Sequence, residues 1–335
     1  MTQVLNANTL PWLLEPDRDR PGVRYLALRE LLGRPESDPA VRRAQKAVMR
    51  SGPVPAILAA QAPEGYWFKP GCGYSPRGLS TIWQILWLAE LGADPADERV
   101  RKGCEYVLSH SVAANGAFSF FERPAPSGAV HCLNGNLVWA LLQLGLGEDP
   151  RVQAALEWIA RAITGQGPIE FYASGTNAPG FACGINLGQP CGWGANKSIR
   201  ALLAVPARTR SPLIKRALRR GAEFLLSRDP AAADYPYTKR VSSTWFKLGF
   251  PLSYWSDVLE TVAHLAALGY GKDPRLARAW AWVLGKQDAD GRWPLENPIR
   301  ARMWADIEAE RGPSKWVTLR ALRALKSAGR LAVPR

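Results

Sequence analysis

A signal for the end of a helix recurs through the chain at a nearly constant interval. Leu-Gly pairs close apolar stretches at Gly33, Gly92, Gly145 and Gly269, and the last interval is about twice the others. Glycine is a common residue just past the last turn of a helix, because it adopts the left-handed backbone that stops the helix. The spacing predicts one further helix end near Pro206. A period of about 55–60 residues indicates a chain built from copies of one structural unit.

A signal for the start of a helix follows each of these ends. Aspartate and serine cap helices well, and proline is favoured at the first helical position. The pattern therefore predicts that each unit contains a pair of helices. The five start signals are Asp38-Pro39, Asp94-Pro95, Asp149-Pro150, Ser211-Pro212 and Asp273-Pro274.

The two helices of each pair differ in polarity, which predicts an inner and an outer set. The first helices are apolar on most faces and are expected at 23–32, 80–91, 135–144, 194–205, 254–268 and 315–328. The second helices carry arginine and glutamate on one face and are expected at 39–58, 98–108, 150–163, 212–226 and 274–284. These helices predict an all-α fold, an (α/α)6 toroid in a single domain, 1–335. Its repeats are expected at roughly 23–67, 80–121, 134–172, 191–237, 254–296 and 314–330.

A more specific motif ends two of the pairs. Gln61-Ala-Pro-Glu-Gly-Tyr-Trp67 and Gln287-Asp-Ala-Asp-Gly-Arg-Trp293 each follow an outer helix, and Asn115-Gly-Ala-Phe118 is a weaker copy. This pattern resembles the QW-type repeat of the prenyltransferase/squalene-cyclase superfamily, and the resemblance covers roughly residues 23–328. It implies an α/α toroid with a central apolar cavity that is open where the inner helices begin. A prenyltransferase- or terpene-cyclase-like activity is what the resemblance implies if the protein is an enzyme.

The chain departs from the characterised branches of that superfamily. Terpene cyclases of class II carry an Asp-x-Asp-Asp motif, whereas Asp288-Ala-Asp290 lies in a turn of this sequence. Protein prenyltransferases hold zinc with an Asp-x-Cys pair, which does not occur here. The resemblance therefore carries over the architecture and not the ligand set.

Four of the five cysteines lie in glycine-rich loops that lead into helices. Zinc favours thiolate and imidazole ligands. We predict that Cys132, Cys183 and Cys191 converge on one zinc ion, with His131 or Cys72 as the fourth ligand. The alternative is that these thiols are buried apolar side chains, the role we assign to Cys104.

Three titratable residues follow one another along the start of the fifth inner helix. Asp257, Glu260 and His264 share a helix face. If that face points into the ring, they form an acid/base set of a catalytic type. The alternative is that the two acids stabilise the N-terminal turn of the helix.

Aromatic and polar residues near the starts of the inner helices form the predicted substrate-binding wall. Lys197 and Lys315 could neutralise an anionic group of the substrate. The tryptophans of the wall are expected to face inward, with packing between helices as their alternative role. The wall consists of Trp83, Gln84, Asn136, Trp139, Trp193, Asn196, Lys197, Trp255 and Lys315.

Composition narrows the classes of partner. The net charge is +14, but the basic residues are scattered and no nucleic-acid recognition motif is present. No apolar run reaches the roughly 18 residues of a membrane helix. The N-terminus lacks the basic and apolar regions of a signal peptide. We therefore expect a cytoplasmic protein with an apolar or anionic small-molecule substrate, no nucleic-acid partner and no transmembrane segment.

Three hypotheses for function remain open at this point. The first is a terpenoid-cyclase- or prenyltransferase-like protein that binds or transforms an isoprenoid or other apolar substrate, with zinc as a candidate cofactor. The second is a carbohydrate-active lyase or hydrolase, in which Asp257 and Glu260 would be the paired carboxylates. The third is a non-catalytic binding or scaffold protein with a structural metal. A narrow apolar lumen favours the first, an open groove with exposed acids the second, and a filled lumen the third.

Overall fold

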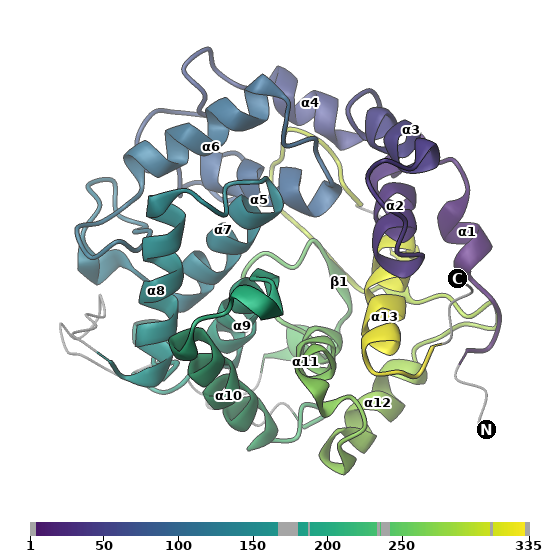
Figure 1. Ribbon diagram of the computed structural model, residues 1–335. Coiled ribbons are helices and arrows are strands. Elements are labelled where there is room, and N and C mark those ends of the chain that lie inside the picture. Colours follow the sequence, from purple (N-terminus) through teal and green to yellow (C-terminus); the bar gives the residue numbers. More distant parts are fainter. Residues whose placement is uncertain are drawn as a thin grey trace.

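The helices form a closed ring of two concentric layers (Figure 1). The computed structural model describes residues 5–166, 180–186, 188–232, 235, 242–308 and 311–331. The chain runs once around the ring, and the last helix lies beside the first inner helix. The predicted all-α toroid is thus confirmed. The predicted repeats 134–172 and 191–237 extend into residues outside the described ranges.

The inner layer surrounds the centre of the ring, and its helices all begin at the same end. Two of them, α2 and α11, continue into a π-helical turn, Ala27–Leu31 and Ala266–Tyr270 respectively. The inner helices are α2 (Pro21–Leu26), α5 (Thr81–Leu91), α7 (His131–Gln143), α9 (Gly192–Ala204), α11 (Val258–Leu265) and α13 (Lys315–Ser327).

The outer layer and the short strands complete the architecture. Helix α1 (Leu10–Leu14) packs against α2 and α13 where the ring closes. The other outer helices are α3 (Pro39–Val48), α4 (Pro53–Ala59), α6 (Glu98–His110), α8 (Pro150–Thr164), α10 (Pro212–Leu226) and α12 (Ala277–Leu284). Strand β1 (Gly249–Phe250) pairs in parallel with β3 (Asn297–Pro298), and β2 (Pro294–Leu295) pairs antiparallel with β4 (Gly312–Pro313). None of the helices in the described ranges is long and apolar enough to cross a membrane.

The predicted stop and start signals act as the repeat analysis requires, with one correction. Gly33, Gly92, Gly145 and Gly269 all have positive φ angles, between 65° and 94°. The carboxylates of Asp38, Asp149 and Asp273 accept hydrogen bonds from the second residue after them, and the Ser211 hydroxyl accepts one from Ile214. Asp94 does not start a helix, because α6 is capped by Asp97, which accepts the Arg99 N–H at 2.9 Å.

Three other predicted boundaries were wrong. Helix α11 begins at Val258 rather than at residue 254, because Asp257 accepts the Glu260 N–H at 2.7 Å and is its cap. Helix α7 begins four residues before Gly135, at His131. The helix expected at 39–58 is divided into α3 and α4, since Gly52 takes a φ of 69° and Pro53 starts a new helix.

The QW-type motifs join each outer helix to the next inner one. The indole N–H of Trp67 donates to the Ile57 carbonyl at 2.6 Å, and that of Trp293 donates to the Val283 carbonyl at 2.7 Å. Their backbone N–H groups donate to threonine hydroxyls of the following inner helices, Thr81 and Thr318. The weaker copy behaves similarly, with the Phe118 N–H donating to the Asn134 side chain at 2.7 Å.

Helices α7 and α9 touch backbone to backbone. A Cβ atom placed on Gly135 would lie 2.2 Å from the carbonyl carbon of Lys197, so only glycine permits this approach. The close contact brings the beginnings of α7 and α9 together, and with them Cys132 and Cys191.

A loop from Leu248 to Asp257 enters the ring and fills part of its centre (Figure 1). Strand β1 anchors it, and the ring of Phe250 stacks on Trp316 of α13 with centroids 4.3 Å apart. The chain itself therefore occupies part of the interior where the resemblance implied a central apolar cavity.

Candidate functional site

Two cavities inside the ring are lined by residues that the structure describes, one near each end of the inner helices. The larger, of about 350 Å³, lies where these helices begin, and we call it the apolar cavity. The smaller, of about 140 Å³, lies toward their other end, and we call it the charged cavity. The loop contributes Tyr254 and Trp255 to the first and Phe250 and Leu252 to the second. The apolar cavity is lined by Tyr74, Phe120, Val130, Cys132, Cys183, Asn186, Cys191, Trp193, Tyr254 and Trp255.

Aromatic rings form most of the wall of the apolar cavity. The predicted residues Trp193 and Trp255 line it directly. Trp83 lies behind the wall, where its ring meets Tyr254 edge-on at 4.8 Å and its indole N–H donates to the Tyr74 carbonyl at 2.7 Å. The hydroxyls of Tyr254 and Tyr74 are hydrogen-bonded to each other. Among the described residues, no aspartate or glutamate lines this cavity.

Three of the predicted metal ligands border the apolar cavity. Cys132 lies in the first turn of α7, Cys191 is the N-cap of α9, and Cys183 lies in the segment before α9. Burial raises the pKa of Cys132 to about 12. A direct contact with Cys183, together with burial, raises the pKa of Cys191 well above its usual value. The side chains of Cys132 and Cys191 are therefore thiols near neutral pH in the absence of a metal.

The two candidates for a fourth ligand lie elsewhere. The Nδ1 atom of His131 is 2.9 Å from the Ser198 hydroxyl, and its ring packs against Trp158 and Phe181. Cys72 donates to the Phe120 carbonyl at 3.5 Å and does not line the cavity. Within the described ranges, no three Cys, His, Asp or Glu side chains are arranged to hold a metal ion. The four-ligand zinc site is not assembled by these residues, and zinc binding stays a prediction.

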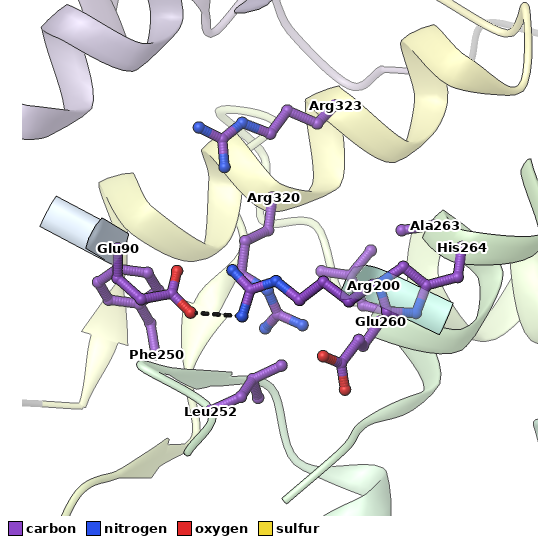
Figure 2. Close-up of a pocket in the computed structure, with 10 residues that line it drawn as sticks. Glu90, Arg200, Phe250, Leu252, Glu260, Ala263, His264, Arg320 and Arg323 are labelled. Atoms are coloured by element: carbon purple, nitrogen blue, oxygen red, sulfur yellow. Dashed lines mark hydrogen bonds and ion pairs between the residues drawn. The ribbon is translucent and has the colours of Figure 1, made fainter. Parts of the chain in front are cut away.

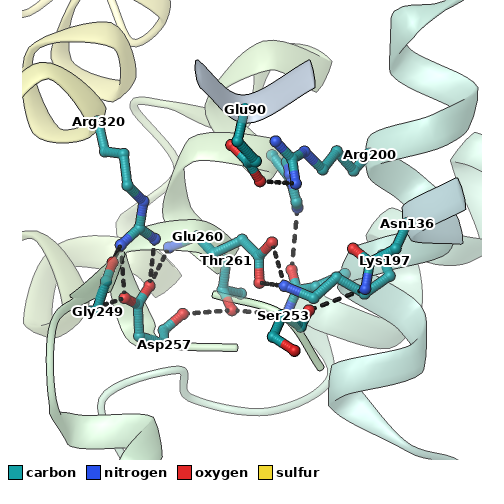
Figure 3. Close-up of polar contacts among 12 residues, drawn as sticks. Glu90, Asn136, Lys197, Arg200, Gly249, Ser253, Asp257, Glu260, Thr261 and Arg320 are labelled. Atoms are coloured by element: carbon teal, nitrogen blue, oxygen red, sulfur yellow. Dashed lines mark hydrogen bonds and ion pairs between the residues drawn. The ribbon is translucent and has the colours of Figure 1, made fainter. Parts of the chain in front are cut away.

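The charged cavity is bordered by acidic and basic side chains from four inner helices (Figure 2). Glu90 comes from α5, Arg200 from α9, Glu260 and His264 from α11, and Arg320 and Arg323 from α13. Figure 3 shows a network of polar contacts across the middle of the ring, which includes Glu90, Arg200, Glu260 and Arg320.

The predicted catalytic acids are each held by a cation within this network. Asp257 is fully buried and accepts two hydrogen bonds from Arg320, at 2.8 and 2.9 Å. Both carboxylate oxygens of Glu260 accept hydrogen bonds from the Nζ of Lys197, at 2.7 and 2.8 Å. Burial alone would raise the pKa of Glu260, but Lys197 brings it down to about 2. Glu260 is therefore ionised near neutral pH, whereas a general acid must be protonated.

His264, the third predicted catalytic residue, borders the charged cavity as a neutral imidazole. Burial lowers its pKa to about 4. Its Nδ1 lies 3.1 Å from the Oδ1 of Asn196, whose Nδ2 donates to the Thr261 hydroxyl at 3.0 Å. This contact fixes the imidazole of His264 in the tautomer in which Nδ1 donates the hydrogen bond. Asn196 thus has a positioning role within the network.

The remaining predicted wall residues make internal contacts. The amide of Gln84 donates to the Gly78 carbonyl at 3.0 Å, and that of Asn136 donates to the Ser253 carbonyl of the inserted loop at 2.8 Å. Trp139 stacks under the guanidinium of Arg200, which lies 3.3 Å from the ring centroid. Lys315 pairs with Asp17 at 3.2 Å. Both lysines expected to bind an anion, Lys197 and Lys315, are thus neutralised by carboxylates of the chain.

Several residues of the two cavities escaped the sequence reasoning. Glu90 is the one charged residue of α5, and this pattern could have identified it. Arg200 and Arg320 lie in helices that carry other basic residues, so their sequence context did not mark them. Arg77 lies in a loop, and no sequence signal singled it out. Its guanidinium lies 4.5 Å from the ring centroid of Trp255, a residue that lines the apolar cavity.

The solved structures that are similar to this chain share little sequence identity with it. No family model matches it, and no curated protein matches it significantly. A type II terpene cyclase from Scytonema shares 13% identity, with 83% of this chain and 95% of the cyclase covered and a TM-score of 0.31. A family 88 glycosyl hydrolase from Bacteroides vulgatus also shares 13% identity, with 94% and 92% covered and a TM-score of 0.49.

Proposed function

We propose that this protein binds an apolar small molecule of the isoprenoid class in the apolar cavity. The cavity itself is the observation that carries the proposal. Its volume of about 350 Å³ lies within the range of small-molecule sites, about 300–1,000 Å³. Five aromatic residues and Val130 form most of its wall, and burial of a ligand's apolar surface against them supplies the binding free energy.

The other two hypotheses have less support. A glycoside hydrolase needs a protonated carboxylic acid beside its substrate. Here Asp257 and Glu260 are each engaged by two hydrogen bonds from a cation and are buried. The inserted loop fills part of the ring, as a scaffold role would allow, but it leaves the apolar cavity beside it. The geometry therefore favours binding of an apolar ligand.

Calorimetric titration with farnesol, a neutral isoprenoid alcohol, tests the proposal. We expect saturable binding to one site. Cys132→Phe should weaken this binding by about tenfold or more, equivalent to roughly 1.4 kcal/mol, because the larger side chain occupies the cavity. Cys104→Ala is the matched control, since Cys104 is a buried thiol that does not border the cavity. Lack of saturable binding to the wild type, or equal affinities in all three proteins, would refute the proposal.

Arg77 gives this site a preference for an anionic group on the ligand. The residue is partly buried, and burial lowers its pKa, which shows that its charge is incompletely solvated. No carboxylate pairs with it in the part of the chain that the structure describes. Stacking on Trp255 occupies one face of the guanidinium and leaves its N–H edge able to donate to an oxyanion.

Farnesoic acid and farnesol, which share one hydrocarbon chain, separate this contribution from apolar binding. Arg77→Gln should weaken binding of the acid by about tenfold and leave the affinity for the alcohol unchanged, since a hydrogen bond between charged groups contributes about 1.5–3 kcal/mol. Arg99→Gln serves as the control, because Arg99 is exposed and far from the cavity wall. An equal loss for acid and alcohol would show that Arg77 only supports Trp255.

A further inference from the structure

Two segments of the cavity wall run antiparallel to each other, and each carries a cysteine. Ala182 and Pro190 form an isolated β-bridge. On one side of it the Cys183 N–H donates to the Gln189 carbonyl at 3.2 Å, and on the other the Cys191 N–H donates to the Phe181 carbonyl at 2.8 Å. The neighbours of a bridged pair project to the same face of an antiparallel pair. Cys183 and Cys191 therefore share the face that borders the apolar cavity.

The two thiols touch each other on that face. Their side chains are in hydrogen-bond contact. The Cys191 sulfur also accepts the Gly194 N–H at 3.5 Å, which holds it at the start of α9. Cys183 is partly exposed, whereas Cys191 is buried. Both border a cavity that a small solute can occupy, unlike Cys104, which is enclosed in the core.

A third thiol lies in the same wall on a different element. Cys132 belongs to α7, whose start is held against α9 by the close approach at Gly194 and Gly135. It borders the cavity with the pair, and its sulfur influences that of Cys191 electrostatically rather than through a hydrogen bond. The pair is thus distinguished from the third thiol by direct contact.

We propose that Cys183 and Cys191 form an oxidisable thiol pair that closes a reversible disulfide in the wall of the apolar cavity. This modification site is independent of the ligand proposed above. The disulfide would form between two segments that the β-bridge already holds side by side, with a sulfur–sulfur bond length of about 2.05 Å. The bond would draw the segment before α9 toward the helix and reshape the wall beside Trp193.

A peroxide serves as the oxidant, and with it the atoms and electrons of disulfide formation balance. Hydrogen peroxide transfers one oxygen atom to the sulfur of Cys183, forming a sulfenic acid and releasing one water. The sulfur of Cys191 then attacks the sulfenic sulfur, the S–S bond forms, and hydroxide leaves and takes up the thiol proton as a second water. The two thiols lose two protons and two electrons, and the peroxide takes these up and is reduced to two waters.

Peptide mass analysis of the folded, full-length protein tests the pair. Cleavage after Arg161 and Lys197 releases one peptide that contains both cysteines and no other. After peroxide treatment and alkylation of free thiols in denaturant, this peptide should be lighter by two hydrogen atoms and unalkylated. Dithiothreitol should restore both alkylation sites. Cys132→Ser is the matched control and should form the same disulfide.

A second variant keeps the test decisive. In Cys191→Ser the sulfenic acid of Cys183 cannot be resolved, so dimedone should trap it there, provided that circular dichroism shows a native fold. Three results would overturn the proposal. They are a disulfide that includes Cys132, full alkylation of the wild-type peptide after oxidation, and about one zinc ion per chain that is lost in Cys191→Ser. The last result would instead establish the predicted metal site.

Discussion

Replacing Lys197 with methionine should lower the free energy of unfolding by about 3–5 kcal/mol, because it leaves the buried carboxylate of Glu260 without the cation that pairs with it. The Lys197 side chain is completely buried and Glu260 is 5% exposed, so water cannot replace the lost partner. The depressed pKa of Glu260 shows how strongly the folded protein favours the ionised pair. Urea denaturation followed by circular dichroism measures the change.

Two further variants show whether the loss comes from the unpaired charge. Adding Glu260→Gln to Lys197→Met removes that charge, and the double variant should recover a large part of the lost stability. Lys286→Met is the control for a solvated pair. Lys286 lies 2.6 Å from Glu296 with both side chains about one quarter exposed, and its loss should cost less than about 1 kcal/mol. Similar losses in the buried and the solvated pair would contradict this account of the network.

Replacing Trp67 with alanine should also cost about 3–5 kcal/mol, the usual range for a large aromatic residue in a core. Trp67 is completely buried and joins α4 to α5 through hydrogen bonds to Ile57 and Thr81. Trp293 makes the equivalent contacts between α12 and α13, so Trp293→Ala should have a similar effect. Chemical denaturation of both variants measures the two losses.

Trp67→Phe separates packing from hydrogen bonding at this position. It retains most of the ring and loses the indole N–H, so we expect a smaller loss than with alanine. Ile57 would then have a buried carbonyl without its indole donor. If Trp67→Ala left the free energy of unfolding nearly unchanged while Trp293→Ala lowered it strongly, the two motifs would not stabilise the ring equally.

The ring architecture was predictable because its signals are local. A glycine with positive φ stops a helix, and an aspartate or serine before a proline starts one at four of the five predicted positions. These signals recur in register, so the helix pairs and their inner and outer layers followed from the sequence. The errors arose where two signals competed, as at Asp94 and Asp97, or where a loop preceded a cap, as at Asp257.

The residues of the site were predicted less well than the ring. The tryptophans Trp193 and Trp255 and the three cysteines before α7 and α9 do border one cavity. Their residue types and their position at the starts of the inner helices were the available signals. The partners of the charged residues were not predictable, because Lys197 and Glu260 are 63 positions apart and meet only across the ring. The same holds for Arg77, which has no carboxylate partner among the residues that the structure describes, because this is visible only once its neighbours are known.

The sequence by itself determined that the chain forms paired helices, and it predicted that these helices close into a ring with the starts of the inner helices at one end. All three depend on backbone conformation and on a polarity pattern repeated along the chain. Only the tertiary structure decided that the loop from Leu248 to Asp257 divides the interior and that carboxylates neutralise the lysines expected to bind an anion. Burial makes an unpaired charge costly. The pairing of each charged side chain is therefore set by the residues that the fold brings around it, and that information lies outside any local segment.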